Sequence, residues 1–353
     1  MSSKTSKLDT SLRICFISGP YQPSKCGISD YLDLLEAEFI KRNYSTKRLW
    51  IESPKDFDLI AKDLPKADLF CVQFAPFSFS KYGLSKKPLY TFAHLLHGKK
   101  VSVNFHEIWI GAYPGASLKE SFHGWLQKHE ILKFLRIARP AAIHTTNSAC
   151  LLRLQRVGIK AKFMYLFGNI PYIKPHTIDS HSGVLRVAFF GTLYESFPYN
   201  RLAEVLRVLS KSLAKKFELR IIGRQRTDGG LLKIKKIASD NEFLFSETKE
   251  LSTHKISLEF SSSSIAVATT PYDILGKSGG TAAMLEHGLP VLVYDDEDTP
   301  KENLFVFSAF RDQVFLLNEN SNIEKITQFI NKPRKVFFDG VSHVADRMLE
   351  EIS

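Results

Sequence analysis

The sequence predicts an α/β protein of two domains, each a doubly wound parallel sheet with helices on both faces. Short β-rich runs alternate with helix-length amphipathic stretches along the whole chain, which is typical of parallel strands joined by crossover helices. Midway, a stretch at 169–183 with two prolines and several small polar residues interrupts this alternation and indicates an interdomain linker. A length of 353 residues suits two domains.

In the first half, Arg13–Ser18 is a β-rich run closed by glycine and proline, which predicts the first strand. Apolar residues from Ile28 to Phe39 then recur at helical spacing and predict an amphipathic helix. Further strands are expected at Asp68–Phe74, Lys100–Phe105, Ala141–Thr145 and Lys162–Leu166.

The second half repeats the pattern after the linker. Strands are expected near Leu185–Phe190, Phe217–Ile222, Ser264–Ala268, Pro290–Tyr294 and Gln313–Leu316, and helices near Tyr199–Leu213, Thr281–Glu286 and Ile323–Ile330. The predicted domains are therefore residues 1–172 and 173–340.

Positive charge is concentrated in the first half of the chain. Residues 1–172 carry 25 Lys and Arg against 13 Asp and Glu, whereas the remainder is nearly balanced. Residues 119–139 combine Phe122 and Trp125 with five basic side chains, and such a helix can lie on an anionic membrane surface. The alternative is a helix that packs on the core and leaves a solvated basic face. No nucleic-acid-binding motif accompanies the charge, so a nucleic-acid partner is not expected.

Cysteine usage and hydropathy indicate a cytoplasmic protein. The cysteines Cys15, Cys26, Cys71 and Cys150 stand far apart without a CxxC pair, which argues against a disulfide scaffold or a zinc ribbon. No apolar run approaches the ~18 residues of a membrane span, and the N-terminus lacks the apolar core of a signal peptide.

Three segments carry a resemblance to a known family. They are Pro23–Tyr31 (PSKCGISDY), Val101–Glu107 (VSVNFHE) and Ser264–Val293, which ends in Glu-His-Gly-Leu-Pro-Val. In order and spacing they resemble the retaining nucleotide-sugar glycosyltransferases of the GT-B fold, closest to glycosyltransferase family four. The resemblance implies two Rossmann-like domains facing a cleft, with acceptor bound by residues 1–172, donor bound by 173–340, and a C-terminal helix at 341–353 that packs back on the first domain.

The implied reaction moves a sugar from a nucleotide diphosphate sugar to a hydroxyl of a glycan or lipid-linked acceptor, with no metal and no cofactor. In the first domain, Gly27 and Ile28 stand where a loop enters a helix, and a glycine there lets backbone amides approach a phosphate. His106 ends a predicted strand, where open α/β sheets bind ligands, and the family analogue contacts the transferred sugar. An ordinary turn glycine and a structural histidine are the alternatives.

In the second domain, the resemblance assigns Glu286 to the ribose diol of the donor. A surface glutamate that ends a helix is the alternative. Two departures concern the donor site: Ser278 stands where the family has a second glutamate, and Thr192 and Phe197 stand where it has a basic pair after Gly191. Lys277, at a helix N-terminus, is then the expected diphosphate ligand, with Arg224 and Arg226 as second choices. The expected helix N-terminus itself comprises Ser278, Gly279, Gly280 and Thr281.

Two further patterns are weaker. Residues 275–281 (LGKSGGT) resemble the end of a phosphate-binding P-loop, but Pro271 replaces the required glycine. The acidic run at 295–298 is more typical of a solvated turn than of a metal site, and no metal is assigned. A sugar-nucleotide epimerase, and a non-catalytic nucleotide-sugar or membrane-binding module, remain the alternative functions.

Overall fold

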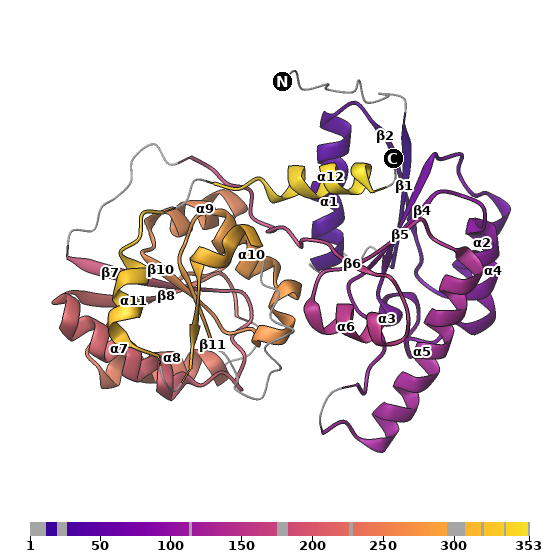
Figure 1. Cartoon of the computed structure of the whole chain (residues 1–353). Helices are drawn as coiled ribbons and strands as arrows, with labels where there is room; N and C mark the ends of the chain where they lie inside the picture. The colour runs from indigo at the N-terminus through magenta and orange to yellow at the C-terminus, as the bar shows by residue number, and fades with distance from the viewer. Residues whose placement is uncertain are drawn as a thin grey trace, which may run out of the picture. The chain divides into compact units, whose positions relative to one another are not determined.

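A computed structural model describes residues 12–19, 27–112, 115–174, 183–225, 229–294, 308–318, 321–334 and 337–351. The chain divides into two compact units (Figure 1). The N-terminal unit comprises Met1–Thr146, Cys150–Met164 and Val341–Ser353, and the C-terminal unit comprises Asn147–Ala149 and Tyr165–Gly340. Cys26, Arg226 and the acidic run at 295–298 lie outside the described residues.

The N-terminal unit contains a six-stranded parallel sheet of order β2-β1-β3-β4-β5-β6. Its strands are β1 (Arg13–Ser18), β2 (Ser45–Trp50), β3 (Leu69–Phe74), β4 (Val101–Phe105), β5 (Ala142–Thr145) and β6 (Lys162–Phe163). Its helices are α1 (Gly27–Lys41), α2 (Asp56–Lys62), α3 (Pro76–Phe79), α4 (Lys86–Leu96), α5 (Leu118–Ala138), α6 (Ser148–Arg156) and α12 (Gly340–Glu350). Figure 1 shows α1 and α12 on one side of the sheet and α2, α4 and α5 on the other.

The two faces of this sheet differ in chemistry. The face toward α4 and α5 is an aromatic core in which Phe74 contacts Phe79, Phe105 and Phe134. The opposite face carries buried polar side chains from neighbouring strands: Gln73, Ser102, Asn104 and His144. Buried parallel strands normally present apolar residues on both faces, so a polar face is unusual and indicates a functional role.

The C-terminal unit contains a second six-stranded parallel sheet, of order β12-β11-β10-β7-β8-β9. Its strands are β7 (Val184–Phe190), β8 (Lys216–Ile222), β9 (Leu244–Glu247), β10 (Ile265–Ala268), β11 (Val291–Tyr294) and β12 (Val314–Leu317). Its helices are α7 (Tyr199–Leu213), α8 (Gly229–Asp240), α9 (Thr253–Ser262), α10 (Gly279–Glu286) and α11 (Ile323–Ile330), with 3-10 turns η1 (Tyr272–Lys277) and η3 (Ser308–Gln313).

Apolar periodicity explains which helices the sequence predicts well. In α7, the residues Leu202, Val205, Leu206 and Leu209 form one buried stripe, and the rest of the helix faces outward. By contrast, all residues of α10 from Thr281 to Glu286 are buried, which is why its sequence shows no amphipathic pattern.

The predicted α/β class with two doubly wound parallel sheets is confirmed. Two strands are missing from the prediction, β2 and β9, and both lie at or next to a sheet edge with partly exposed side chains. Because edge strands are not buried on both faces, their sequences (STKRLW and LFSE) lack the continuous apolar run that marks the central strands.

The C-terminal helix α12 is bound to the N-terminal unit along its length and just after its end. Arg42 donates hydrogen bonds to the Ser342 hydroxyl near the start of this helix (2.7 Å) and to Asp346 Oδ1 in its middle (2.5 Å). After its last residue, Glu351 Oε2 lies 2.6 Å from His144 Nε2 on the polar face of the sheet. None of the helices in the described ranges is both long and apolar enough to span a bilayer.

Candidate functional site

In the C-terminal sheet, the chain order reverses between β7 and β10. From β7 the chain proceeds outward to β8 and β9, and it then returns to the other side of β7 to form β10, β11 and β12. The carboxyl ends of strands at such a switch point are where open α/β sheets bind ligands. The loops that follow β7, β8 and β10 therefore form the first candidate site.

Hydrogen bonds join the loops after β7 and β10. The Thr269 hydroxyl donates to the carbonyl oxygen of Thr192 (2.8 Å) and accepts from the Tyr194 amide (3.1 Å). Gly191, directly after β7, has a φ of +87°, and a Cβ at this position would meet no atom within 4 Å. The positive φ favours glycine here, and the open space beside it leaves room for a ligand.

The start of α10 lies against the end of β7. Ser278 caps the helix by accepting a hydrogen bond from the Thr281 amide (3.1 Å). A Cβ on Gly280 would lie 3.2 Å from the Phe190 ring, so glycine permits the close approach of helix and strand. The amides of Gly279 and Gly280 belong to the first turn, where N–H groups have no partner within the helix and the dipole is positive. An anion is therefore favoured at this point.

Two basic residues flank this helix start. Lys277 is exposed and immediately precedes the cap, and Arg224 is exposed directly after Gly223 at the end of β8. The loop that carries Arg224 is fixed by a hydrogen bond from the Gly223 amide to the Thr248 hydroxyl (2.7 Å). The structure thus brings Gly191, Thr192, Arg224 and the segment 277–281 to one edge of one sheet.

Asn169 is a member of this site that the sequence analysis treated as linker. Its Oδ1 is buried without a hydrogen-bond partner and lies 3.9 Å from the position of a Cβ on Gly279. A buried carbonyl oxygen without a partner is costly in a folded protein unless a ligand or water satisfies it. Its sequence surroundings, a proline-containing stretch after an apolar run, gave no signal for this role.

Glu286 lies elsewhere on α10. It ends the helix, about 10 Å along the axis from Gly279, and its side chain is 4% exposed. Its Oε1 accepts hydrogen bonds from the Tyr165 hydroxyl (2.7 Å) and the Gly168 amide (2.9 Å). The ribose role of Glu286 stays a prediction, and the contacts observed for it are internal to the C-terminal unit.

The surroundings of Glu286 favour its neutral form. Burial raises the pKa of this carboxyl to about 8. The two hydrogen bonds act to lower the pKa, whereas the nearby Asp339 adds to the rise. The Tyr165 hydroxyl is buried as well, and burial and the adjacent Glu286 raise its pKa. At neutral pH the Glu286 side chain is thus mainly an uncharged acid.

In the N-terminal unit, the order of the sheet reverses between β1 and β3. Gly19 follows β1, and a Cβ there would lie 2.3 Å from the Ser78 Cβ, so only glycine allows the loop to pass this close to α3. Gly27 and Ile28 are the first residues of α1, and a Cβ on Gly27 would meet nothing within 4 Å. The loop before them, at 20–26, lies outside the described residues.

His106 follows β4 and is 7% exposed. Its Nε2 lies 2.8 Å from Gln73 Oε1, which also accepts a hydrogen bond from Asn104 Nδ2 (3.1 Å). Its ring and the ring of Tyr31 in α1 meet at an interplanar angle of 78°, with centroids 5.4 Å apart. Because Gln73 Oε1 is an acceptor, His106 donates through Nε2. The Oδ1 of Asn104 is buried without a partner, so this end of the polar sheet face retains an unused acceptor.

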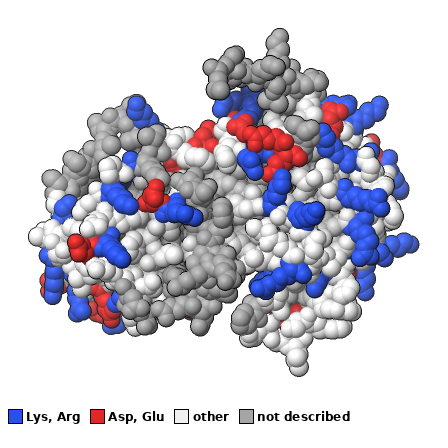
Figure 2. All heavy atoms as spheres, in the orientation of Figure 1, with Lys and Arg blue, Asp and Glu red and all other residues white. Residues whose placement is uncertain are grey.

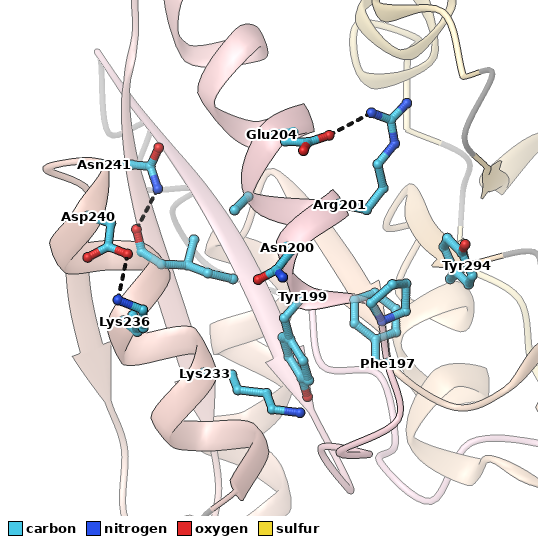
Figure 3. A pocket seen from close by; sticks show the side chains of 13 residues that line it. Phe197, Tyr199, Asn200, Arg201, Glu204, Lys233, Lys236, Asp240, Asn241 and Tyr294 are labelled. Atoms are coloured by element: carbon cyan, nitrogen blue, oxygen red, sulfur yellow. Dashed lines mark hydrogen bonds and ion pairs between the residues drawn. The ribbon is translucent and has the colours of Figure 1, made fainter.

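A groove on the C-terminal unit is separate from these residues. This groove has a volume of about 730 Å³ and lies beside α7 and α8, with Tyr294 at one end (Figure 3). Of the donor-site positions considered in the sequence, only Phe197 lines it, and none of the predicted donor ligands does. Charged side chains of this groove interact with other groups of the protein. Lys236 forms an ion pair with Asp240 (3.1 Å), Arg201 forms one with Glu204 (2.8 Å), and Lys233 donates a hydrogen bond to the backbone carbonyl oxygen of Glu195 (2.7 Å).

Within the described ranges, no cluster of three or more His, Cys, Asp or Glu residues has the arrangement of a metal site. The groups that the structure assembles at the switch point are backbone amides, a lysine and an arginine, which suit an anion, together with the carbonyl oxygen of Asn169, which can accept a hydrogen bond from a ligand hydroxyl.

No protein-family model matches the sequence, and no curated protein matches it significantly. Solved structures do resemble it. The lipopolysaccharide outer core galactosyltransferase WaaB has 13% identity and a TM-score of 0.55, with 95% of each chain covered. An α-glucosyltransferase in complex with UDP and DNA has 13% identity and a TM-score of 0.54, covering 97% of this chain and 94% of that one.

A protein from Listeria monocytogenes described as a UDP-N-acetylglucosamine 2-epimerase has 11% identity and a TM-score of 0.56, covering 97% of this chain and 96% of that one. The shared architecture is two doubly wound parallel-sheet domains along nearly the whole chain. The chain therefore has the GT-B fold of glycosyltransferases.

Proposed function

We propose that this protein is a glycosyltransferase that uses a nucleotide diphosphate sugar as donor and binds the diphosphate at the start of α10. The observation that carries the proposal is the position of this helix start. Ser278 caps the helix, two glycines form its first residues, and the helix begins at the switch point between β7 and β10. UDP in the complex of the similar α-glucosyltransferase supports a nucleotide donor.

In this proposal the chemistry of the C-terminal unit is charge stabilisation. As the bond between sugar and diphosphate breaks, negative charge grows on the leaving diphosphate. The amides of Gly279 and Gly280 and the ammonium of Lys277 stabilise that charge, and Asn169 aids in orienting the donor. No metal is required for this arrangement, since fixed dipoles and one cation replace it.

For the stereochemical course we propose retention. The acceptor hydroxyl then attacks from the face that the diphosphate leaves, and its proton passes to a departing phosphate oxygen. The sugar keeps its configuration, and the chain need supply no nucleophile. His106 and its partner Gln73 belong in this proposal to the sugar-binding part of the N-terminal unit, and the acceptor is a glycan or a lipid-linked sugar.

The donor site can be tested by binding before any acceptor is known. A panel of nucleoside diphosphates and their sugars is screened by thermal shift, since a ligand at 100 times its Kd stabilises the fold by ~2.7 kcal/mol. The ligand that binds is then titrated calorimetrically into the wild type, Lys277→Ala and Lys216→Ala. Lys216 is the first residue of β8, so it lies at the amino ends of the strands, away from the proposed site, and serves as the matched control.

We expect Lys277→Ala to weaken binding by ~1.5–3 kcal/mol, the contribution of one charge-assisted hydrogen bond, and Lys216→Ala to leave it unchanged. Incubation of the donor alone and with candidate acceptors then identifies the product. Release of nucleoside diphosphate with transfer supports the proposal, whereas an epimerised sugar nucleotide identifies an epimerase. Absence of binding to every member of the panel contradicts the proposal.

A further inference from the structure

Large apolar side chains lie exposed along the first two turns of α5. Leu118 is 91% exposed, Phe122 is 64% exposed and Trp125 is 53% exposed. Their spacing of i, i+4 and i+7 places them on one face of the helix, where the Phe122 and Trp125 rings stack with centroids 6.0 Å apart. This group is called the α5 patch below.

The α5 patch is not the core-facing side of the helix. The buried stripe of α5 comprises Gly124, Gln127, Glu130, Ile131, Phe134, Leu135 and Ala138. Helical spacing alone permits Phe122 and Trp125 to face the core, but in the structure both are exposed and point away from the aromatic core that Phe134 joins. Their exposure therefore needs another explanation.

The first turns of α5 are held firmly, so the exposure does not come from a frayed helix end. Ser117 and Glu120 form a reciprocal capping box at the helix start. A Cβ on Gly124 would lie 1.9 Å from the Ile110 carbonyl oxygen, so the chain at Ile110 packs directly on the helix. Gln127 Oε1 fastens the same loop by accepting a hydrogen bond from the Ile110 amide (3.0 Å).

Two further exposed aromatic residues lie beside a neighbouring face of α5, at His123. Phe77 is 43% exposed and stacks on His123 of α5, with the ring planes 10° apart. Tyr82 is 65% exposed, and its backbone carbonyl oxygen lies 2.6 Å from His123 Nε2. Five large apolar or aromatic side chains thus emerge on one rigid part of the N-terminal unit.

Basic residues surround these side chains. Residues 81–162 carry 14 Lys and Arg against three Glu, and one of these acids, Glu130, is buried. Further along the exposed face of α5, Lys133 and Arg136 continue the line of the patch, and Lys119 stands beside it. Lys128 is half-buried, with its Nζ 5.8 Å from the centre of the Trp109 ring. Figure 2 shows Lys and Arg side chains spread over the N-terminal unit, with few acids on its right-hand side.

We propose that the α5 patch docks the protein on an anionic lipid bilayer. Tryptophan and phenylalanine insert at the level of the headgroups, and lysine and arginine bind the anionic surface around them. The strong positive charge favours a lipid surface over a second copy of the chain, because two such patches would repel each other when apposed. This inference is independent of the donor chemistry, since it concerns a different surface.

The test is cosedimentation of the full chain with vesicles of phosphatidylcholine alone or with 30% phosphatidylglycerol. One variant is Phe122→Ser with Trp125→Ser, and a second is Lys119→Glu with Arg136→Glu. Their matched controls lie on the C-terminal unit: Leu232→Ser with Leu244→Ser for exposed apolar residues, and Lys211→Glu with Lys215→Glu for exposed cations. Circular dichroism of each variant checks that it is folded.

We expect wild type and both controls to sediment with anionic vesicles only, and to be released by high salt. Loss of one basic residue should weaken partitioning into the vesicles about fivefold, and reversal of its charge should weaken it further. The variant with Phe122→Ser and Trp125→Ser should partition at least ~10-fold more weakly than wild type. Tryptophan fluorescence of the wild type should shift to the blue on vesicle addition, and this shift should be lost with Trp125→Ser. Equal binding of all folded variants, or no binding to anionic vesicles, overturns the proposal. A dimer in solution that dissociates in the Phe122 and Trp125 variant would instead assign the patch to self-association.

Discussion

Replacing Glu286 by glutamine tests whether this buried carboxyl is a neutral structural group. The amide is nearly isosteric, and its oxygen can accept the hydrogen bonds that Tyr165 and Gly168 donate to Oε1. The substitution therefore removes the ionisable proton and leaves the packing in place. Alanine would instead leave two buried donors without an acceptor, so a loss of ligand binding in that variant could reflect damage to the fold.

The expected effect follows from the shift in pKa. Burial raises the pKa of Glu286 to about 8 from its ordinary value of 4.5. Between these two pH values the folded chain holds the proton and the unfolded chain does not, so stability falls as pH rises through this range. The slope is ~1.4 kcal/mol per pH unit, and the total loss is about 5 kcal/mol by pH 8. Glu286→Gln should abolish this loss.

Urea unfolding measured at intervals from pH 5 to pH 9 decides the matter. We expect the free energy of unfolding of Glu286→Gln to approach or fall below that of wild type near pH 5 and to exceed it increasingly toward pH 8. Glu242→Gln, at an exposed position of the same unit, is the control and should follow the wild-type curve. Parallel curves for wild type and Glu286→Gln would refute a neutral Glu286. A selective loss of nucleotide affinity in Glu286→Gln would favour the ribose role that the sequence predicts.

The remaining predictions concern the N-terminal unit. His106→Ala should lower turnover while the protein stays folded, because Asn104 still donates a hydrogen bond to Gln73. A product assay measures turnover, and circular dichroism measures folding. Unchanged turnover would show that His106 is not part of the site. NMR of the product's anomeric proton should show retention. Arg42→Ala should lower the free energy of unfolding by ~1.5–3 kcal/mol in urea titrations, since it breaks partly buried charge-assisted bonds to α12. An unaltered midpoint would mean that α12 is held by other contacts.

Local patterns predict the central elements of both sheets well. The bounds of β1, α7 and α11 agree with the sequence analysis at every residue, because a buried strand reads as an apolar run and an amphipathic helix as a 3.6-residue period. Beyond the missing strands β2 and β9, the sequence leaves open which apolar residues of α5 face the core. Phe122 and Leu135 both fit a helical period of apolar residues, yet Leu135 is buried and Phe122 is exposed. Periodicity alone does not distinguish a stripe of apolar residues that faces the core from one that faces outward.

The donor site is predictable only in part for a similar reason. The cap at Ser278 and the glycines after it have a sequence signature that the analysis found. The contribution of Asn169 depends on contact across 110 residues of chain, and the internal bonding of Glu286 depends on Tyr165 and Gly168, which are as remote in sequence. Such long-range contacts follow from the fold and have no local signal.

The fastening of α12 by Arg42 and His144 makes the N-terminal unit a discontinuous domain, with consequences for its biosynthesis. About 180 residues separate Met164 from Val341, where the chain re-enters this unit. At ~5–20 residues per second, translation of that interval takes roughly 10–35 s. Throughout this time the buried polar side chains around His144 lack the last helix that covers them. A nascent chain is thus obliged to carry an incomplete first domain while the second one forms, and this interval is when a chaperone would be of most use to it.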